Sequence, residues 1–226
     1  IARDPQEASS WFLRGLLNYL DNNGDGVLAD MAKARELGHE ASIIDMQCGM
    51  VHYQRQQWRE AEAALGRAIE RDGGQADAML FFVRAAARQQ LGDLAAAAAD
   101  FDIALERPSN TQAALRLLPA FEAKDSADLF SALRAELPRG HEHAAFVYPA
   151  RAFVRARLGR FADAEQDFDA AIRLDFAAVV DKISRAFEAT ALPAVAQARD
   201  ALRTMSAQLG GDSALYAGRG VMRRNL

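Results

Sequence analysis

A spacing of about 34 residues recurs along this chain and constrains its fold more than any other feature. Small residues, always Gly or Ala, mark the period at Gly15, Gly49, Ala85, Ala152, Ala186 and Gly220. The third gap is about twice the others, so it spans two periods. A second series with the same spacing runs through Ala34, Ala68, Ala104 and Ala171. A fixed period of this length is typical of a repeat protein whose units stack on their neighbours.

Each period has the layout of two amphipathic helices joined by a short turn, most clearly in segments 42–75 and 145–178. The small residues allow the two helices to approach closely. Large apolar residues occupy matching positions in the second helices, at Trp58, Phe101, Phe161 and Phe168. Gly92 and Gly159 fall between the helices, where a left-handed residue would end the first one. The sequence therefore predicts a series of helical hairpins.

With this period and layout, the chain resembles the tetratricopeptide repeat family, whose unit is about 34 residues long. The resemblance is most specific in 42–75, 78–110 and 145–178. It implies an all-α, right-handed superhelical solenoid, formed by a single array over residues 1–226. The repeats are expected at 8–41, 42–77, 78–110, 111–144, 145–178 and 179–212, with a final helix at 213–226.

The repeat expected at 111–144 departs most from the pattern. Pro119 falls where its first helix should continue, and proline removes a backbone donor and clashes with the preceding turn. We therefore expect a kink or break in that repeat. If the break interrupts the stack, blocks 1–110 and 145–226 could move as a hinge.

An arginine precedes the small residue in five of the six aligned repeats, at Arg14, Arg84, Arg151, Arg185 and Arg219. Sixteen residues after the first three come Asp30, Asp100 and Asp167. The second repeat has Cys48 in place of the arginine, and it also lacks the aspartate, because Ala64 stands there. The joint absence predicts a salt bridge between the two helices of one repeat. The alternative, in which the arginines bind an anionic ligand, remains open.

The composition excludes several classes of protein. With 27 basic against 31 acidic residues, the formal net charge is −4, which argues against a general nucleic-acid binder. A single cysteine excludes a disulfide framework within the chain. No apolar run is long enough to insert in a membrane. The chain opens without a recognisable leader, so its compartment, cytoplasmic or periplasmic, stays open.

Segment 21–26, Asp-Asn-Asn-Gly-Asp-Gly, matches the opening of a calcium-binding loop. The match then fails, because Ala32 stands where the loop needs its bidentate acid. His141 and His143 flank Glu142 without a third ligand nearby in sequence, and Cys48 falls on a packed helix face. No recognisable catalytic motif is present. We therefore expect a metal-free turn at 21–26, no cofactor and no enzymatic activity.

In the tetratricopeptide repeat family, the exposed side of each first helix lines an inner groove. Carried onto this sequence, that register gives a mostly apolar set: Phe12, Leu16, Tyr19, Met46, Met50, Tyr53, Met79, Phe82, Phe153, Arg157 and Phe187. The Lys and Asn with which some members bind a peptide carboxylate are absent from these positions.

An apolar wall of this kind predicts a protein-interaction scaffold that binds an apolar or amphipathic segment of a partner protein in its concave groove. Two alternatives stay open. The wall could mediate self-association into a homo-oligomer, or it could be core that is packed between neighbouring repeats. A calcium-responsive adaptor is a further alternative, which only the 21–26 segment supports.

Overall fold

The computed structural model describes residues 7–107, 143–174 and 211–225. In these ranges the chain is all-α, with one short 3₁₀ helix and no strand. The helices are α1 (Ala8–Leu20), α2 (Gly24–Glu36), α3 (Ser42–Gln54), α4 (Trp58–Asp72), η1 (Gly73–Gln75), α5 (Ala78–Leu91), α6 (Leu94–Glu106), α9 (Ala144–Arg157), α10 (Phe161–Arg173) and α13 (Gly211–Arg224). None of the described helices is both long enough and apolar enough to span a membrane.

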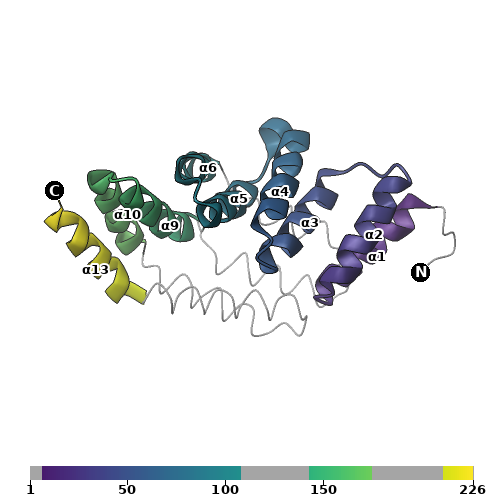
Figure 1. Cartoon of the computed structure of the whole chain (residues 1–226), viewed down its shortest axis with the longest axis horizontal. Coiled ribbons are helices and arrows are strands. Elements are labelled where there is room, and N and C mark those ends of the chain that lie inside the picture. Colours follow the sequence, from purple (N-terminus) through teal and green to yellow (C-terminus); the bar gives the residue numbers. More distant parts are fainter. Residues whose placement is uncertain (1–6, 108–142, 175–210, 226) are drawn as a thin grey trace.

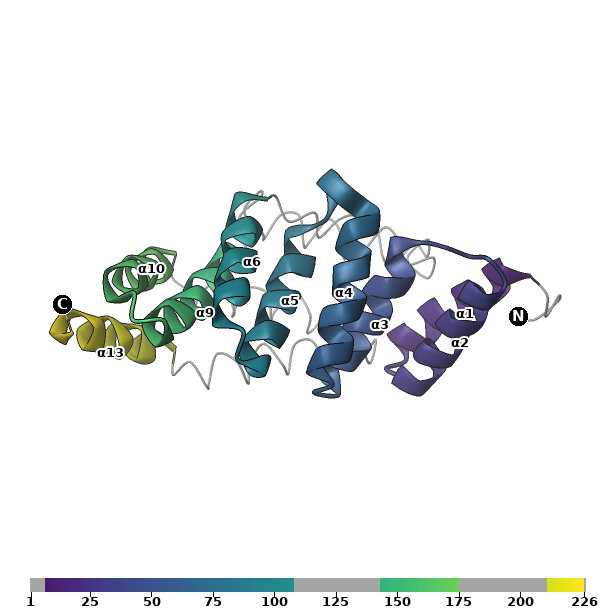
Figure 2. The ribbon, with the colours of Figure 1, turned by 45° about the horizontal axis from the view of Figure 1, so that its top comes forward.

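Successive helices pack in pairs, and each pair packs on the next. The hairpins are α1–α2, α3–α4, α5–α6 and α9–α10, and α13 packs against α10. Figures 1 and 2 show these helices following one another along an arc from α1 to α13. In the middle of the arc, α5 lies nearer its inner side than α6 (Figure 1). This arrangement confirms the predicted all-α helical-repeat solenoid.

The small residues lie where the two helices of a hairpin come closest. A Cβ atom added to Gly49 would lie 2.7 Å from Cγ of Leu65, on the opposite helix. The turns between paired helices each use one left-handed residue: Asn22, Gln56, Gly92 and Gly159, with φ between 57° and 84°. A left-handed residue ends the first helix and reverses the chain, as the sequence predicted for the two glycines.

The third hairpin packs directly on the fourth, although residues 107–143 separate α6 from α9 in sequence. Both helices contribute to one core cluster, in which Phe101 and Ala104 of α6 lie with Val147 and Val154 of α9. Asp102 of α6 also bonds to two arginines of α9. A shared core therefore joins the two blocks in the described helices, and the expected hinge stays a prediction. Pro119 lies outside the described residues.

Candidate functional site

Buried ion pairs hold the two helices of a hairpin together. Arg84 Nε and Nη2 donate to the two carboxylate oxygens of Asp100, at 2.8 and 2.7 Å. Arg151 makes the same paired contact with Asp167, at 3.0 and 2.6 Å, and Arg14 makes it with Asp30. The predicted salt bridges are confirmed in all three hairpins that carry the motif. Two parallel hydrogen bonds fix the relative orientation of the helices as well as their separation.

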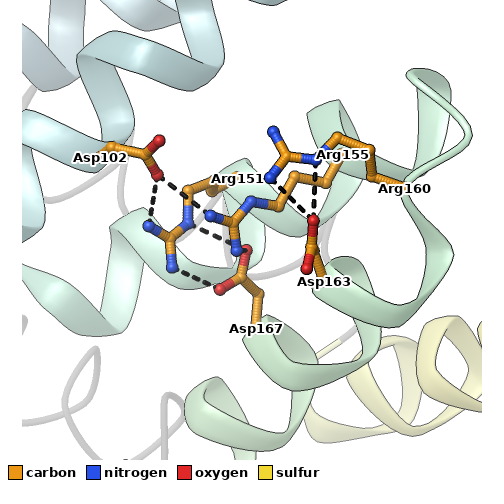
Figure 3. Close-up of polar contacts among 6 residues, drawn as sticks. All are labelled: Asp102, Arg151, Arg155, Arg160, Asp163 and Asp167. Atoms are coloured by element: carbon orange, nitrogen blue, oxygen red, sulfur yellow. Dashed lines mark hydrogen bonds and ion pairs between the residues drawn. The ribbon is translucent and has the colours of Figure 1, made fainter.

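Each of these aspartates also accepts a hydrogen bond from a residue one turn further along the first helix. The donors are Asn18, Arg88 and Arg155, at 2.8 to 2.9 Å. Figure 3 shows this arrangement for Arg151 and Arg155, which also reach Asp102 on the preceding hairpin. Burial alone would lower the pKa of Arg151, but the bonds with Asp167 and Asp102 raise it above its ordinary value. The arginine therefore stays charged in its partly buried site.

The arginine that precedes the small residue of a repeat lies over an aromatic ring, which stands three residues earlier on the same helix. The pairs are Trp11 with Arg14, Phe81 with Arg84, Tyr148 with Arg151 and Tyr216 with Arg219, at 4.3 to 5.6 Å from the ring centre. The positive charge is attracted to the ring face in this geometry. Arg219 also pairs with Asp169 of α10 at 2.9 Å. These four arginines therefore have internal partners.

Six of the predicted groove residues lie partly buried on α1, α3 and α5, the first helices of the first three hairpins. We use the name apolar row for Phe12, Tyr19, Met46, Met50, Tyr53 and Phe82, which are all partly buried and pack against core clusters. Met46 contacts two of these clusters and so joins the first part of the row to the rest. Met79 and Phe153, on α5 and α9, are more exposed, at 38% each. The members of the row are thus partly buried, whereas Met79 and Phe153 are exposed.

Ring contacts fix several members of this set. Phe12 stacks on His39 at 4.5 Å between ring centres, and the Phe82 ring lies 5.8 Å from that of Phe101. Phe153 meets Phe168 edge to face at 5.3 Å. Burial raises the pKa of the Tyr19 and Tyr53 hydroxyls, which therefore stay neutral. These ring contacts anchor Phe12, Phe82 and Phe153 on one side.

One residue of the predicted set lies in the core instead. Leu16 is only 1% exposed and lies in the core with Val27 and Met31, because its position on α1 faces the paired helix and the next hairpin. Its assignment to the groove is therefore corrected. Arg157 is exposed at the last residue of α9. Phe187 lies outside the described residues.

The residues considered for metal binding have structural contacts. Asn23 caps α2 by accepting a hydrogen bond from the Gly26 backbone N–H at 3.1 Å, and Asp25 pairs with Arg55 at 2.8 Å. The described parts of the chain contain no group of three side chains suited to a metal ion. His143 is buried, and its Nε2 lies 2.7 Å from the Ala104 carbonyl. His141 and Glu142 lie outside the described residues.

Sequence reasoning missed a buried carboxylate in the second hairpin. Asp45 is 1% exposed and is surrounded by Arg35, Arg67 and Arg71, at 2.8 to 3.2 Å. The thiol of Cys48, one turn further on, is buried, which raises its pKa. The sequence offered one sign of it, because Asp45 stands where the other described first helices carry an aromatic ring.

No protein-family model matches this chain, and no curated protein matches it. Among solved structures, it is similar to the TPR2AB domain of yeast Sti1 in complex with an Hsp90 peptide. The two share 19% sequence identity over 96% of this chain and 98% of the other, with a TM-score of 0.38. A similarity of this strength carries no argument about function.

Proposed function

We propose that this chain is a non-enzymatic protein-interaction scaffold that binds an apolar or amphipathic segment of a partner protein in its concave groove. Two observations support the proposal: the apolar row is only partly buried on three hairpins, and the predicted groove residues Met79 and Phe153 are exposed. Monomeric proteins rarely leave a large contiguous apolar surface open to water.

The chemistry of the row suits a peptide partner. Met46 and Met50 are unbranched and polarizable, so they can adapt to different side chains. The aromatic members are anchored on one side and lose little conformational freedom when a partner binds. No lysine or arginine belongs to the row, which favours an apolar contact over capture of a charged terminus.

The proposal can be tested by selecting helical peptides that bind the immobilised chain from a displayed library. We expect the double variant Met79→Glu/Phe153→Glu to bind the selected peptides at least tenfold more weakly, because a carboxylate would be desolvated in the contact. Leu91→Glu/Leu158→Glu is the matched control. Both leucines lie at the C-terminal ends of the same two helices and are similarly exposed. An equal loss of peptide affinity in both double variants would argue against binding in the groove.

Self-association is a second candidate, because α13 exposes Tyr216 and Val221 at the end of the described stack. In that case the chain would form a homo-oligomer through apolar contacts. Sedimentation velocity over a range of concentrations distinguishes the two candidates. A dimer that Tyr216→Glu disperses would favour self-association, whereas a monomer at every concentration would leave the scaffold as the better proposal.

A further inference from the structure

Three arginines surround Asp45 at the junction of the first two hairpins, and we call them the arginine cluster. Arg35 comes from α2, whereas Arg67 and Arg71 come from α4. Arg35 Nη2 and Arg67 Nε donate to Oδ1 of Asp45 at 2.8 Å, and Arg71 Nε lies 3.2 Å from Oδ2. Asp45 is buried, but the arginine side chains are 36–47% exposed. The cluster thus has a buried base and a solvent-facing rim.

This cluster stands where the repeat pattern breaks. The other described first helices carry an aromatic ring followed three residues later by arginine, but the second hairpin carries Asp45 and Cys48. Its second helix has Ala64 in place of the paired aspartate. The acid has therefore moved to the first helix, and the cations come from the helices on either side. The fold does not require three arginines at the buried aspartate, because one or two arginines bind the equivalent aspartate in the other hairpins.

The balance of charge distinguishes the arginine cluster from the other buried networks. Arg84 and Arg88 face Asp100 and Glu62, and the network drawn in Figure 3 sets Arg151 and Arg155 against Asp102 and Asp167. Both of those networks are neutral.

Around Asp45, three arginines face two carboxylates. The second is Glu40, which is 67% exposed and touches only Arg71, at 3.2 Å. The cluster therefore carries one surplus positive charge at its rim. A guanidinium has five N–H donors, and the contacts with Asp45 and Glu40 engage one nitrogen of Arg35, one of Arg67 and two of Arg71.

We propose that the arginine cluster binds a phosphate group carrying two negative charges, as in a phosphate monoester. Planar guanidinium groups match the oxygen spacing of phosphate and donate to it in pairs. A phosphate group offers enough acceptors to bridge Arg35 and Arg67 at the same time. A carboxylate would only repeat the single contact that Glu40 already makes.

The proposed site does not depend on the proposed scaffold function, because none of its residues belongs to the apolar row. Arg35 belongs to the first hairpin, and the other two arginines belong to the second. A phosphate bridging them fastens one hairpin to the next. Glu40, in the loop between α2 and α3, competes for Arg71 and is displaced by the incoming group.

Calorimetry on the full chain tests the proposal at constant ionic strength. The probes are inorganic phosphate and N-acetylphosphoserine amide. We expect saturable binding that Arg67→Gln weakens about tenfold, since each charge-assisted hydrogen bond contributes on that scale. Glu40→Gln should strengthen binding, because it removes the competing carboxylate. Arg88→Gln, in a neutral network, is the matched control and should leave the affinity unchanged.

The two probes distinguish the source of the phosphate. Similar binding of both supports recognition of the phosphate group itself, and binding of phosphoserine alone supports a phosphorylated side chain. The proposal is overturned if neither probe binds the wild-type chain saturably, or if Arg67→Gln binds as tightly as wild type. Circular dichroism checks the fold of each variant. If Arg67→Gln does not fold, the exposed variant Glu40→Gln serves as the test instead. The proposal is then overturned if Glu40→Gln binds phosphate no more tightly than the wild type.

Discussion

Asp30, Asp100 and Asp167 are each 2% exposed, and their burial is tolerated because at least two polar donors bind each carboxylate. The exposure of the partner arginine should set how strongly each pair is coupled. The Arg84 side chain is 14% exposed, whereas that of Arg14 is 42% exposed and more screened by water. In double-mutant cycles with alanine, we expect a coupling energy for Arg84–Asp100 above the ~1 kcal/mol upper value of exposed pairs.

The coupling for Arg14–Asp30 should be smaller, and urea unfolding of the single and double variants measures both energies. Equal coupling in the two hairpins would show that solvent exposure does not govern these pairs. Arg88 and Asn18 are kept in every variant, so the bond that each donates to its aspartate is lost equally in the aspartate single variant and in the double variant.

Residue spacing revealed the contacts that repeat and missed those that do not. Arg84 and Asp100 could be paired from the sequence because the same interval recurs in three hairpins. Asp45 could not, since its partners lie 10, 22 and 26 residues away and no other hairpin copies them. Leu16 was misplaced for a related reason. Register alone cannot tell which side of a first helix the next hairpin covers.

At the scale of helices, Gly49 on α3 and Gly220 on α13 hold the same position of the repeat but have different surroundings. A Cβ on Gly49 would meet Leu65 at Cγ and also its backbone nitrogen, which cannot move freely. A Cβ on Gly220, in the same register on α13, would meet no atom of the described residues within 4 Å. The sequence could not distinguish the two glycines, because both stand at the same position of the 34-residue period.

Substitution by alanine should therefore have opposite effects at these two positions. Gly49→Ala should lower the unfolding free energy, because overpacking costs about 1–3 kcal/mol and outweighs the gain in helix propensity. Gly220→Ala should raise it by about 0.5–1 kcal/mol, since only the propensity changes. Thermal and urea unfolding measure both effects. A destabilising Gly220→Ala would mean that another part of the chain packs against α13 at this point.

On the scale of the whole chain, the sequence predicted the individual hairpins well, but it did not predict as well which hairpins pack on one another. Local spacing identifies each hairpin, because the two helices of one repeat are adjacent in the chain. It cannot show which hairpins stack, since that depends on surfaces that are distant in sequence. The contact of α6 with α9 is such a case. Val147 and Val154 gave no sign in the sequence that they would join the cluster of Phe101.

This shared cluster should make α6 and α9 open together. Val154 is fully buried against residues of α5 and α6, so Val154→Ala should remove about 2 kcal/mol of packing energy from that cluster. We expect hydrogen exchange to speed up in α6 as well as in α9, because a cooperative unit loses protection as a whole. Phe168→Leu is the control, since Phe168 belongs to a separate cluster with Ala152 and Leu215. It should speed exchange in α10 and α13 and leave α6 protected. If Val154→Ala changes α9 alone, the third and fourth hairpins open independently, and the shared core does not couple them.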